Sequence, residues 1–146
     1  MILPDVNLLV HAHNEASRFH PPALRWWMEL MRGRKPVGLA RASVMGFVRI
    51  VTQPGIQSSP LKVETALAIT DSWFARTNVQ LLHPGSRHYR IFASLLREVG
   101  TAGNLVSDAH LAALAIENQA ELHSNDADFV RFPGLRWVNP LSTSPP

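Results

Sequence analysis

Short apolar runs alternate with longer amphipathic segments along this 146-residue chain. The short runs are typical of strands, whereas the longer segments place apolar residues at helical spacing. Two strands joined by a helix usually pair in parallel, because the helix carries the chain back to the start of the sheet. The pattern therefore predicts an α/β fold, a three-layer α/β/α domain with a central parallel sheet of short strands.

The expected strands cover residues 1–6, 36–39, 79–82, 121–123 and 135–138, and the expected helices cover residues 7–14, 20–32, 43–51, 61–75, 87–99 and 105–118. Two helices have an apolar face that follows from residue spacing: Leu24, Trp27, Met28 and Met31 in one, and Val63, Leu67, Thr70 and Phe74 in the other. Ser86 is expected to cap the helix that follows it. Residues 1–141 contain no linker or repeat and are expected to form a single domain, with a disordered tail at 142–146.

Composition limits where and how such a chain works. Hydrophobic residues make up 46% of it, which is enough for a proper core, and no apolar run is long enough for a membrane span. The N-terminus does not have the pattern of a signal peptide. Cysteine is absent, which excludes disulfides, zinc–thiolate sites and cysteine nucleophiles. A cytoplasmic location, with no membrane partner, is the simplest expectation.

The charge balance is basic, with a formal net charge of +3 and a sequence pI of about 10.2. Twelve of the fourteen cationic residues are arginine. Arginine suits phosphate recognition because its planar group binds two oxygens at once, so nucleic acid is a reasonable partner. An arginine-rich composition is also what a GC-rich genome produces, and the sequence leaves both explanations open.

Four of the eleven acidic residues stand apart from the expected exposed helix faces. Asp5 follows the first strand, Asp108 opens a helix that is almost uncharged, and Asp126 and Asp128 lie in the loop after the fourth strand. Three of them have an ordinary explanation, since Asp108 can stabilise a helix N-terminus and Asp126 and Asp128 can cap a turn. The ends of parallel strands nevertheless meet at one edge of a sheet, so Asp5 and Asp126 are expected at the same edge.

A group of aspartates at one edge would need a cation. Two carboxylates ~4 Å apart repel by ~4 kcal/mol at an effective dielectric constant near 20. A fold keeps such a group where a cation relieves the repulsion. Oxygen ligands without cysteine favour Mg²⁺, with Mn²⁺ as a possible substitute, over zinc.

Three segments, ILPDVNLLVHA, GNLVSDAHLAALAIE and LHSNDADFVRFPGLRWVNPL, closely resemble the motifs of PIN-domain proteins, and specifically of the VapC toxins of bacterial toxin–antitoxin pairs. The resemblance spans residues 1–141. It implies a PIN-like α/β domain and a Mg²⁺-dependent endoribonuclease that cleaves RNA. It also implies a VapB-type antitoxin that occupies and silences the site, and it suggests a homodimer.

The resemblance assigns roles to individual residues. It implies that Asp5, Asp108 and Asp126 are the catalytic, metal-binding acids. Ser124 matches the hydroxyl residue that supports the site, and Asn7 and Asn104 are candidates for supporting hydrogen bonds. Asp128 is interpreted as a structural or supporting residue, and the histidines are not expected to be catalytic.

One position departs from the family pattern. The family usually has a glutamate in the helix after the second strand, where this chain has Gly46 or a neighbour, and residues 30–63 contain no acid at all. A site with three acids should bind metal more weakly. The alternative is a degenerate PIN domain that binds RNA or a protein without cutting, although retention of the other acids argues against it.

Other doubly wound enzymes fit less well. A haloacid-dehalogenase-type phosphatase needs Asp-x-Asp after the first strand, and the chain has Asp5-Val-Asn7. A response-regulator receiver needs a late lysine, whereas the only lysines are Lys35 and Lys62. If RNA is the substrate, the candidates for phosphate contacts are Arg41, Arg49, Arg87, Arg90 and Arg131.

Overall fold

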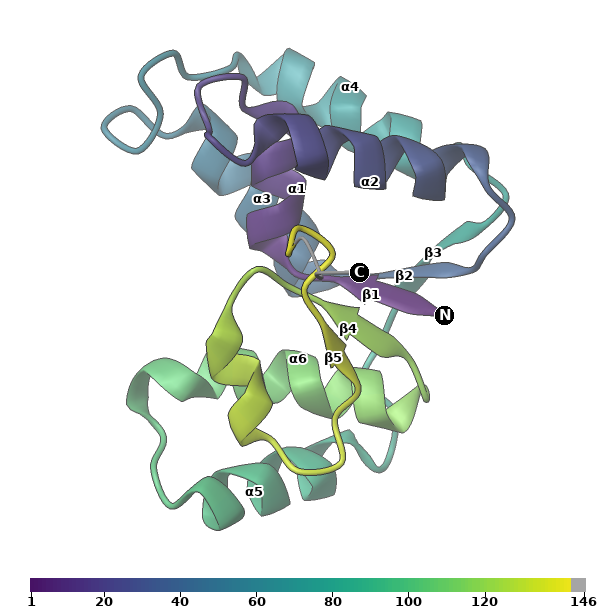
Figure 1. Ribbon diagram of the computed structural model, residues 1–146, viewed down its shortest axis with the longest axis vertical. Helices are drawn as coiled ribbons and strands as arrows, with labels where there is room; N and C mark the ends of the chain where they lie inside the picture. The colour runs from purple at the N-terminus through teal and green to yellow at the C-terminus, as the bar shows by residue number, and fades with distance from the viewer. Residues whose placement is uncertain (143–146) are drawn as a thin grey trace.

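The structure, a computed structural model, describes residues 1–142 and is built around one parallel sheet (Figure 1). Its strands are β1 (Ile2–Pro4), β2 (Val37–Ala40), β3 (Val79–Leu82), β4 (Glu121–His123) and β5 (Trp137–Val138). They lie in the order β3-β2-β1-β4-β5, and every neighbouring pair is parallel. The order reverses direction between β1 and β4, and such a switch point leaves a crevice at the carboxyl ends of the two strands.

Helices cover both faces of the sheet, which confirms the predicted three-layer fold. On one face lie α1 (Val6–His13), α2 (His20–Arg32), α3 (Arg41–Thr52) and α4 (Val63–Phe74). On the other lie α5 (His88–Val99) and α6 (Val106–Glu117) (Figure 1). A short 3₁₀ turn, η1 (Gly103–Leu105), precedes α6, and a second, η2 (Ala127–Arg131), follows β4. None of the helices formed by residues 1–142 has the length and apolar character that a membrane crossing requires.

The central strand β1 is buried on both faces and separates two hydrophobic cores. Ile2 belongs to the core beneath α1–α4, and Leu3 belongs to the core beneath α5 and α6. Successive side chains of a strand point to opposite faces, so three residues serve both layers. The run Ile2-Leu3-Pro4 is therefore apolar without alternation, as expected for a parallel strand that is buried on both sides.

The apolar faces predicted for α2 and α4 are wrong in detail. The buried face of α2 is Ala23, Trp26, Trp27 and Leu30, and that of α4 is Ala66, Thr70 and Trp73. Met28, Val63, Leu67 and Phe74 are exposed instead. Tryptophan decides both cases, because Trp27 and Trp73 pack edge to face with ring centroids 5.4 Å apart, and this contact joins the two helices.

The predicted cap of α5 by Ser86 is also wrong. The helix begins at His88, and the carboxylate of Glu117 at the end of α6 accepts hydrogen bonds from the backbone N–H groups of Gly85 and Arg87, at 2.9 and 3.2 Å. Glu117 thus fixes the turn that leads into α5, and the helix itself has no side-chain N-cap. Of the predicted tail, Ser142 is described and contacts the backbone of Asn139, and residues 143–146 lie outside the described range.

Candidate active site

Asp5 lies at the carboxyl end of β1 and is the N-cap of α1. Its Oδ1 accepts a hydrogen bond of 2.7 Å from the backbone N–H of Val6, and its own N–H donates to the carbonyl of His123 at the end of β4. The residue is thus fixed at the crevice where the strand order reverses. A local helix cap and a bond to the neighbouring strand set the direction of its carboxylate.

Ser124 connects the groups on both sides of this crevice. Its buried hydroxyl donates to Oδ2 of Asp5 at 2.7 Å, and it accepts from the side-chain amide of Asn7 at 3.2 Å and from the backbone N–H of Asp126 at 3.0 Å. One oxygen therefore orients a carboxylate from the first strand and the loop after the fourth. The amide oxygen of Asn7 also accepts from the N–H of Asn125 at 3.5 Å, so Asn7 joins the same network.

Three further carboxylates meet beside this network. Asp108 is the third residue of α6, and Asp126 is the N-cap of η2, where its side chain accepts from the N–H of Asp128 at 2.9 Å. Asp108, Asp126 and Asp128 each offer one carboxylate oxygen, and the three oxygens lie within 4.8 Å of one another. No cationic side chain forms an ion pair with them among residues 1–142.

Burial and the neighbouring negative charges raise the pKa values of two of the site's carboxyl groups. Burial, followed by the charges of Asp5, Asp126 and Asp128, raises the pKa of Asp108 to about 6. Burial also raises the pKa of Asp5, and the charge of Asp126 adds to the effect against the hydrogen bonds from Ser124 and Val6. The ionised form of both carboxylates is therefore disfavoured, and a bound divalent cation would stabilise it.

The residues predicted for the site come together to different degrees. Asp5 is not among the three mutually close carboxylates, although its charge acts on both Asp108 and Asp126. Asn104 lies on the exposed turn η1. Asp128, for which the sequence predicts a structural or supporting role, contributes an oxygen to the close cluster. The Asp-x-Asp spacing at 126–128 is only a hint, since it brings both side chains to one side once the loop after β4 forms the turn η2.

Gly46 lies on α3, at or next to the position where the resemblance to PIN-domain proteins leads us to expect a glutamate. A Cβ at this position would meet only the side chain of Val6, at 3.4 Å, which is an ordinary van der Waals contact. Val6 directly follows Asp5. The position therefore faces the first strand end and leaves open space beside it.

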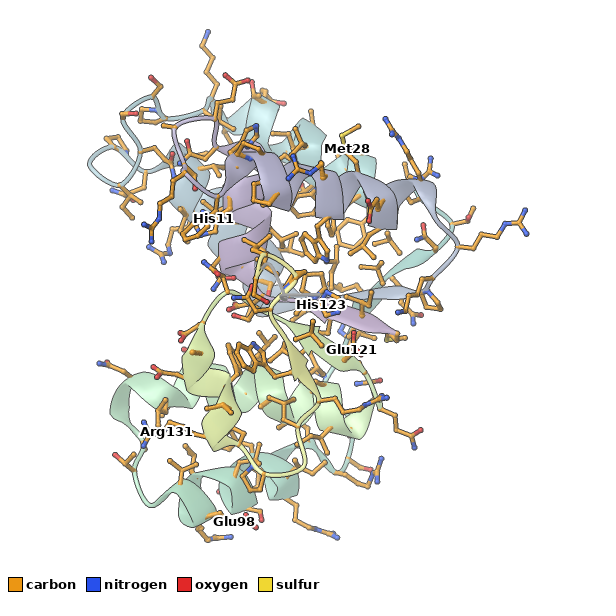
Figure 2. All side chains as sticks on the ribbon, in the orientation of Figure 1. His11, Met28, Glu98, Glu121, His123 and Arg131 are labelled. Carbon is orange, nitrogen blue, oxygen red and sulfur yellow. The ribbon has the colours of Figure 1, made fainter. Side chains whose placement is uncertain are left out.

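A buried contact between α2 and β4 holds the fourth strand end in place. The indole N–H of Trp26 donates to Nδ1 of His123 at 3.0 Å, and Nε2 of His123 donates to Glu121 at 2.7 Å. Figure 2 shows His123 and Glu121 close together on β4. Burial lowers the pKa of His123. This histidine is fully engaged in positioning the strand that leads into Ser124.

The donor set of the cluster suits one type of cofactor. It consists of carboxylate oxygens alone, at the switch point of a parallel sheet, and hard divalent cations prefer such ligands. Asp108, Asp126 and Asp128 can hold such an ion, and relief of their mutual repulsion favours its binding.

Comparisons with known proteins agree with this geometry. A PIN domain model matches residues 2–135. The chain is 41% identical over 141 residues to Ribonuclease VapC33 of Mycobacterium tuberculosis, covering 97% of this chain and 99% of that protein. It is 43% identical over 140 residues to Ribonuclease VapC37 of the same species, covering 96% and 97%.

A solved structure shows the same fold. A chain in the crystal structure of VapBC2 from Rickettsia felis, bound to a DNA fragment from their promoter, superposes with a TM-score of 0.69 at 19% identity, covering 95% of this chain and 98% of that one. The PIN domain model and the relatives above, each matched over nearly the full chain, identify the family. The chain belongs to the PIN-domain family and, within it, to the VapC proteins.

Proposed function

We propose that this protein is a Mg²⁺-dependent endoribonuclease and the toxin of a toxin–antitoxin pair. The observation that carries the proposal is the cluster of Asp108, Asp126 and Asp128, whose oxygens lie within 4.8 Å of one another at the sheet edge that Asp5 also occupies. The relatives VapC33 and VapC37 are named as ribonucleases, which supports RNA as the substrate. An RNA substrate would place the protein in the cytoplasm.

The proposed reaction is hydrolysis of a phosphodiester bond. A bound Mg²⁺ would lower the pKa of a water molecule and neutralise charge on the phosphate. Asp108, Asp126 and Asp128 would hold the ion. Asp5, fixed by Ser124 and by the N–H of Val6, adds negative charge from the other side of the crevice.

Partners extend the proposal. The solved relative from Rickettsia felis is a VapBC complex, which supports a VapB-type antitoxin as the partner that blocks this chain. A homodimer is part of the same proposal, and exposed Val63, Leu67 and Phe74 on α4 are apolar residues that an interface would cover. Size-exclusion chromatography with light scattering, with and without a co-expressed antitoxin, tests both.

The central experiment is cleavage of total RNA by the purified protein with Mg²⁺ or with EDTA. We expect cleavage only with the metal ion, and loss of at least a hundredfold in Asp5→Asn and Asp108→Asn. The exposed Glu98 on α5 gives a matched acidic control, and Glu98→Gln should cut as the wild type does. Undiminished cleavage by Asp108→Asn would contradict the mechanism.

Gly46 in place of the family glutamate motivates the alternative of a degenerate domain that binds RNA or a protein without cutting. That alternative predicts RNA binding in a gel-shift assay without cleavage at any Mg²⁺ concentration. Metal titration distinguishes the two proposals, since a site that lacks the glutamate and binds metal weakly still cuts at raised Mg²⁺ or Mn²⁺.

A further inference from the structure

An open pocket of about 780 Å³ lies at the carboxyl ends of β2 and β3, between α3 and α6. One wall is α3, where Arg41, Met45 and Arg49 face the pocket at successive turns. The remaining walls include buried Leu82 and Leu114. The pocket is thus apolar at its base and basic at its rim.

The pocket borders the carboxylate site described above. Gly46 forms part of its lining, and this glycine faces Val6, the residue after Asp5. The pocket lies at the ends of β2 and β3, and the candidate active site lies at the ends of the next two strands of the sheet, β1 and β4. Neighbouring strands are about 4.8 Å apart, so the midpoints of the two strand pairs lie two spacings, or roughly 10 Å, from each other.

The arginines at the rim of the pocket have no acidic residue on their own helix. No aspartate or glutamate occurs in residues 30–63, which include all of α3. Neither Arg41 nor Arg49 forms an ion pair with any of residues 1–142, and the guanidinium of Arg41 lies 3.4 Å from Nδ1 of His83. Two exposed cations on one helix, two turns or roughly 12 Å apart, thus flank an apolar space.

We propose that this pocket binds one nucleoside of the RNA strand next to the scissile phosphate, with Arg41 and Arg49 contacting the phosphates on either side. The inference rests on the proposed function and extends it to substrate recognition. RNA complements this pocket, because its phosphates are anionic and its nucleobases have apolar faces. The phosphates would meet the basic rim, and a nucleobase would pack on the apolar base of the pocket. Gly46 has no side chain that would fill this space. A glutamate at this position would also place a carboxylate beside the phosphates.

Methionine methyl groups provide a direct test in the full chain. The protein has four methionines, of which only Met45 lines the pocket, so Met1, Met28 and Met31 are internal controls. The wild type labelled with [¹³C-methyl]methionine is titrated in EDTA with an eight-nucleotide single-stranded RNA, with the four nucleoside 5′-monophosphates, and with ribose 5-phosphate. We expect ring-current shifts at Met45 with the RNA and with at least one monophosphate, and none with ribose 5-phosphate.

Two outcomes overturn the pocket assignment alone. In the first, the RNA is cut with Mg²⁺ and binds in EDTA, yet the Met45 methyl does not move. In the second, Met45 moves with a co-expressed antitoxin and not with RNA, which would assign the pocket to a protein partner. Absence of both RNA binding and cleavage would instead contradict the proposed function itself.

Substitutions test the rim and the base separately by fluorescence anisotropy with the same RNA. Arg41→Gln and Arg49→Gln should each weaken binding about fivefold and reduce the salt dependence by about one counterion. Arg97→Gln, on the exposed surface of α5, is the matched control and should change neither quantity. Gly46→Leu should weaken binding about tenfold and Gly46→Ala less, whereas equal affinities for Gly46→Leu and wild type would overturn the proposal.

Discussion

At the residue scale, Ser124 is the group on which the site's geometry depends most. Its hydroxyl orients Asp5, Asn7 and the backbone of Asp126 at once. Ser124→Ala removes the donor to a carboxylate that is already disfavoured by burial. We expect cleavage to fall 10- to 100-fold, a range typical of lost support to metal ligands, and the free energy of unfolding to fall by about 1–3 kcal/mol.

Cleavage rates and urea unfolding curves measure the two effects of Ser124→Ala. The exposed Ser94 on α5 supplies the control, and Ser94→Ala should match the wild type in both. If Ser124→Ala lost stability but kept the wild-type cleavage rate, the hydroxyl would be a structural group without a role in orienting Asp5.

Asp108 should make the metal-free protein less stable at neutral pH. Its pKa in the folded state is about 6, above the ordinary value of 3.8, so the folded state holds more protons than the unfolded state between these values. The free energy of unfolding therefore falls as pH rises from about 4 to 6, and the full penalty is present at pH 7. Asp108→Asn removes it.

The Asp108→Asn variant in EDTA should gain on the order of 1 kcal/mol at pH 7. The carboxyl is partly exposed, and water screens it well below the value for a buried charge. Urea unfolding at pH 4 and pH 7 measures the gain, which should shrink at the lower pH because the wild-type Asp108 is then protonated as well. A gain that is equal at both pH values would assign it to packing and not to charge.

At the element scale, the link between α2 and β4 is the contact that positions the fourth strand end. Trp26→Phe removes the N–H that bonds to the buried ring of His123 and leaves Nδ1 without a donor. Trp27→Phe makes the same reduction in size, next to Trp73 in the neighbouring part of the core. The hydrogen bond should make Trp26→Phe the more costly variant, by about 1 kcal/mol.

Urea unfolding at pH 7.5 compares the two tryptophan variants, and cleavage rates report on the site. Because the carbonyl of His123 accepts from the N–H of Asp5, we expect Trp26→Phe to cut more slowly than Trp27→Phe. Equal stability and equal cleavage rates would show that the strand end holds its position without the indole.

Elements were the level at which the sequence was most informative. Each strand lies within two or three residues of its predicted range, because apolar runs bounded by Pro, Gly or Asn are local signals. The buried faces of α2 and α4 were predicted only in part, at Trp27 and Thr70, because each helix has further apolar residues beside its buried face. Which side is buried depends on how Trp27 meets Trp73, a contact between segments far apart in the sequence.

The sequence predicted the edge of the sheet at which the site lies, but not which side chains meet there. The rule that ligands bind where parallel strands end placed Asp5 and Asp126 together, and the structure has both at that edge. The sequence did not show that Ser124 would bond to Asp5 across 119 positions, or that Asp128 would join the close carboxylates. Both depend on how the loop after β4 turns, which tertiary contacts decide.

At the scale of the whole molecule, the carboxylates come from parts that pack in different cores. Asp5 precedes α1, which packs beneath one face of the sheet, and Asp108 lies on α6, which packs beneath the other. A cation held by Asp108, Asp126 and Asp128 would tie α6 to the loop after β4, and Asp5 would add its charge from the other half at the switch point. Binding to the folded state alone stabilises it, by about 2.7 kcal/mol at a concentration one hundred times the dissociation constant.

We therefore expect Mg²⁺ or Mn²⁺ to raise the melting temperature of the wild type by several degrees, in proportion to the logarithm of concentration once the site is saturated. EDTA should reverse the rise. Asp108→Asn should abolish the rise in melting temperature, because the ion would lose one ligand. The variant also lacks the repulsion among the carboxylates that metal binding relieves in the wild type. Glu98→Gln, which removes one negative charge far from the cluster, should keep the full response. Differential scanning calorimetry at several Mg²⁺ concentrations makes the comparison, and a rise of equal size in Asp108→Asn would show that the ions bind elsewhere.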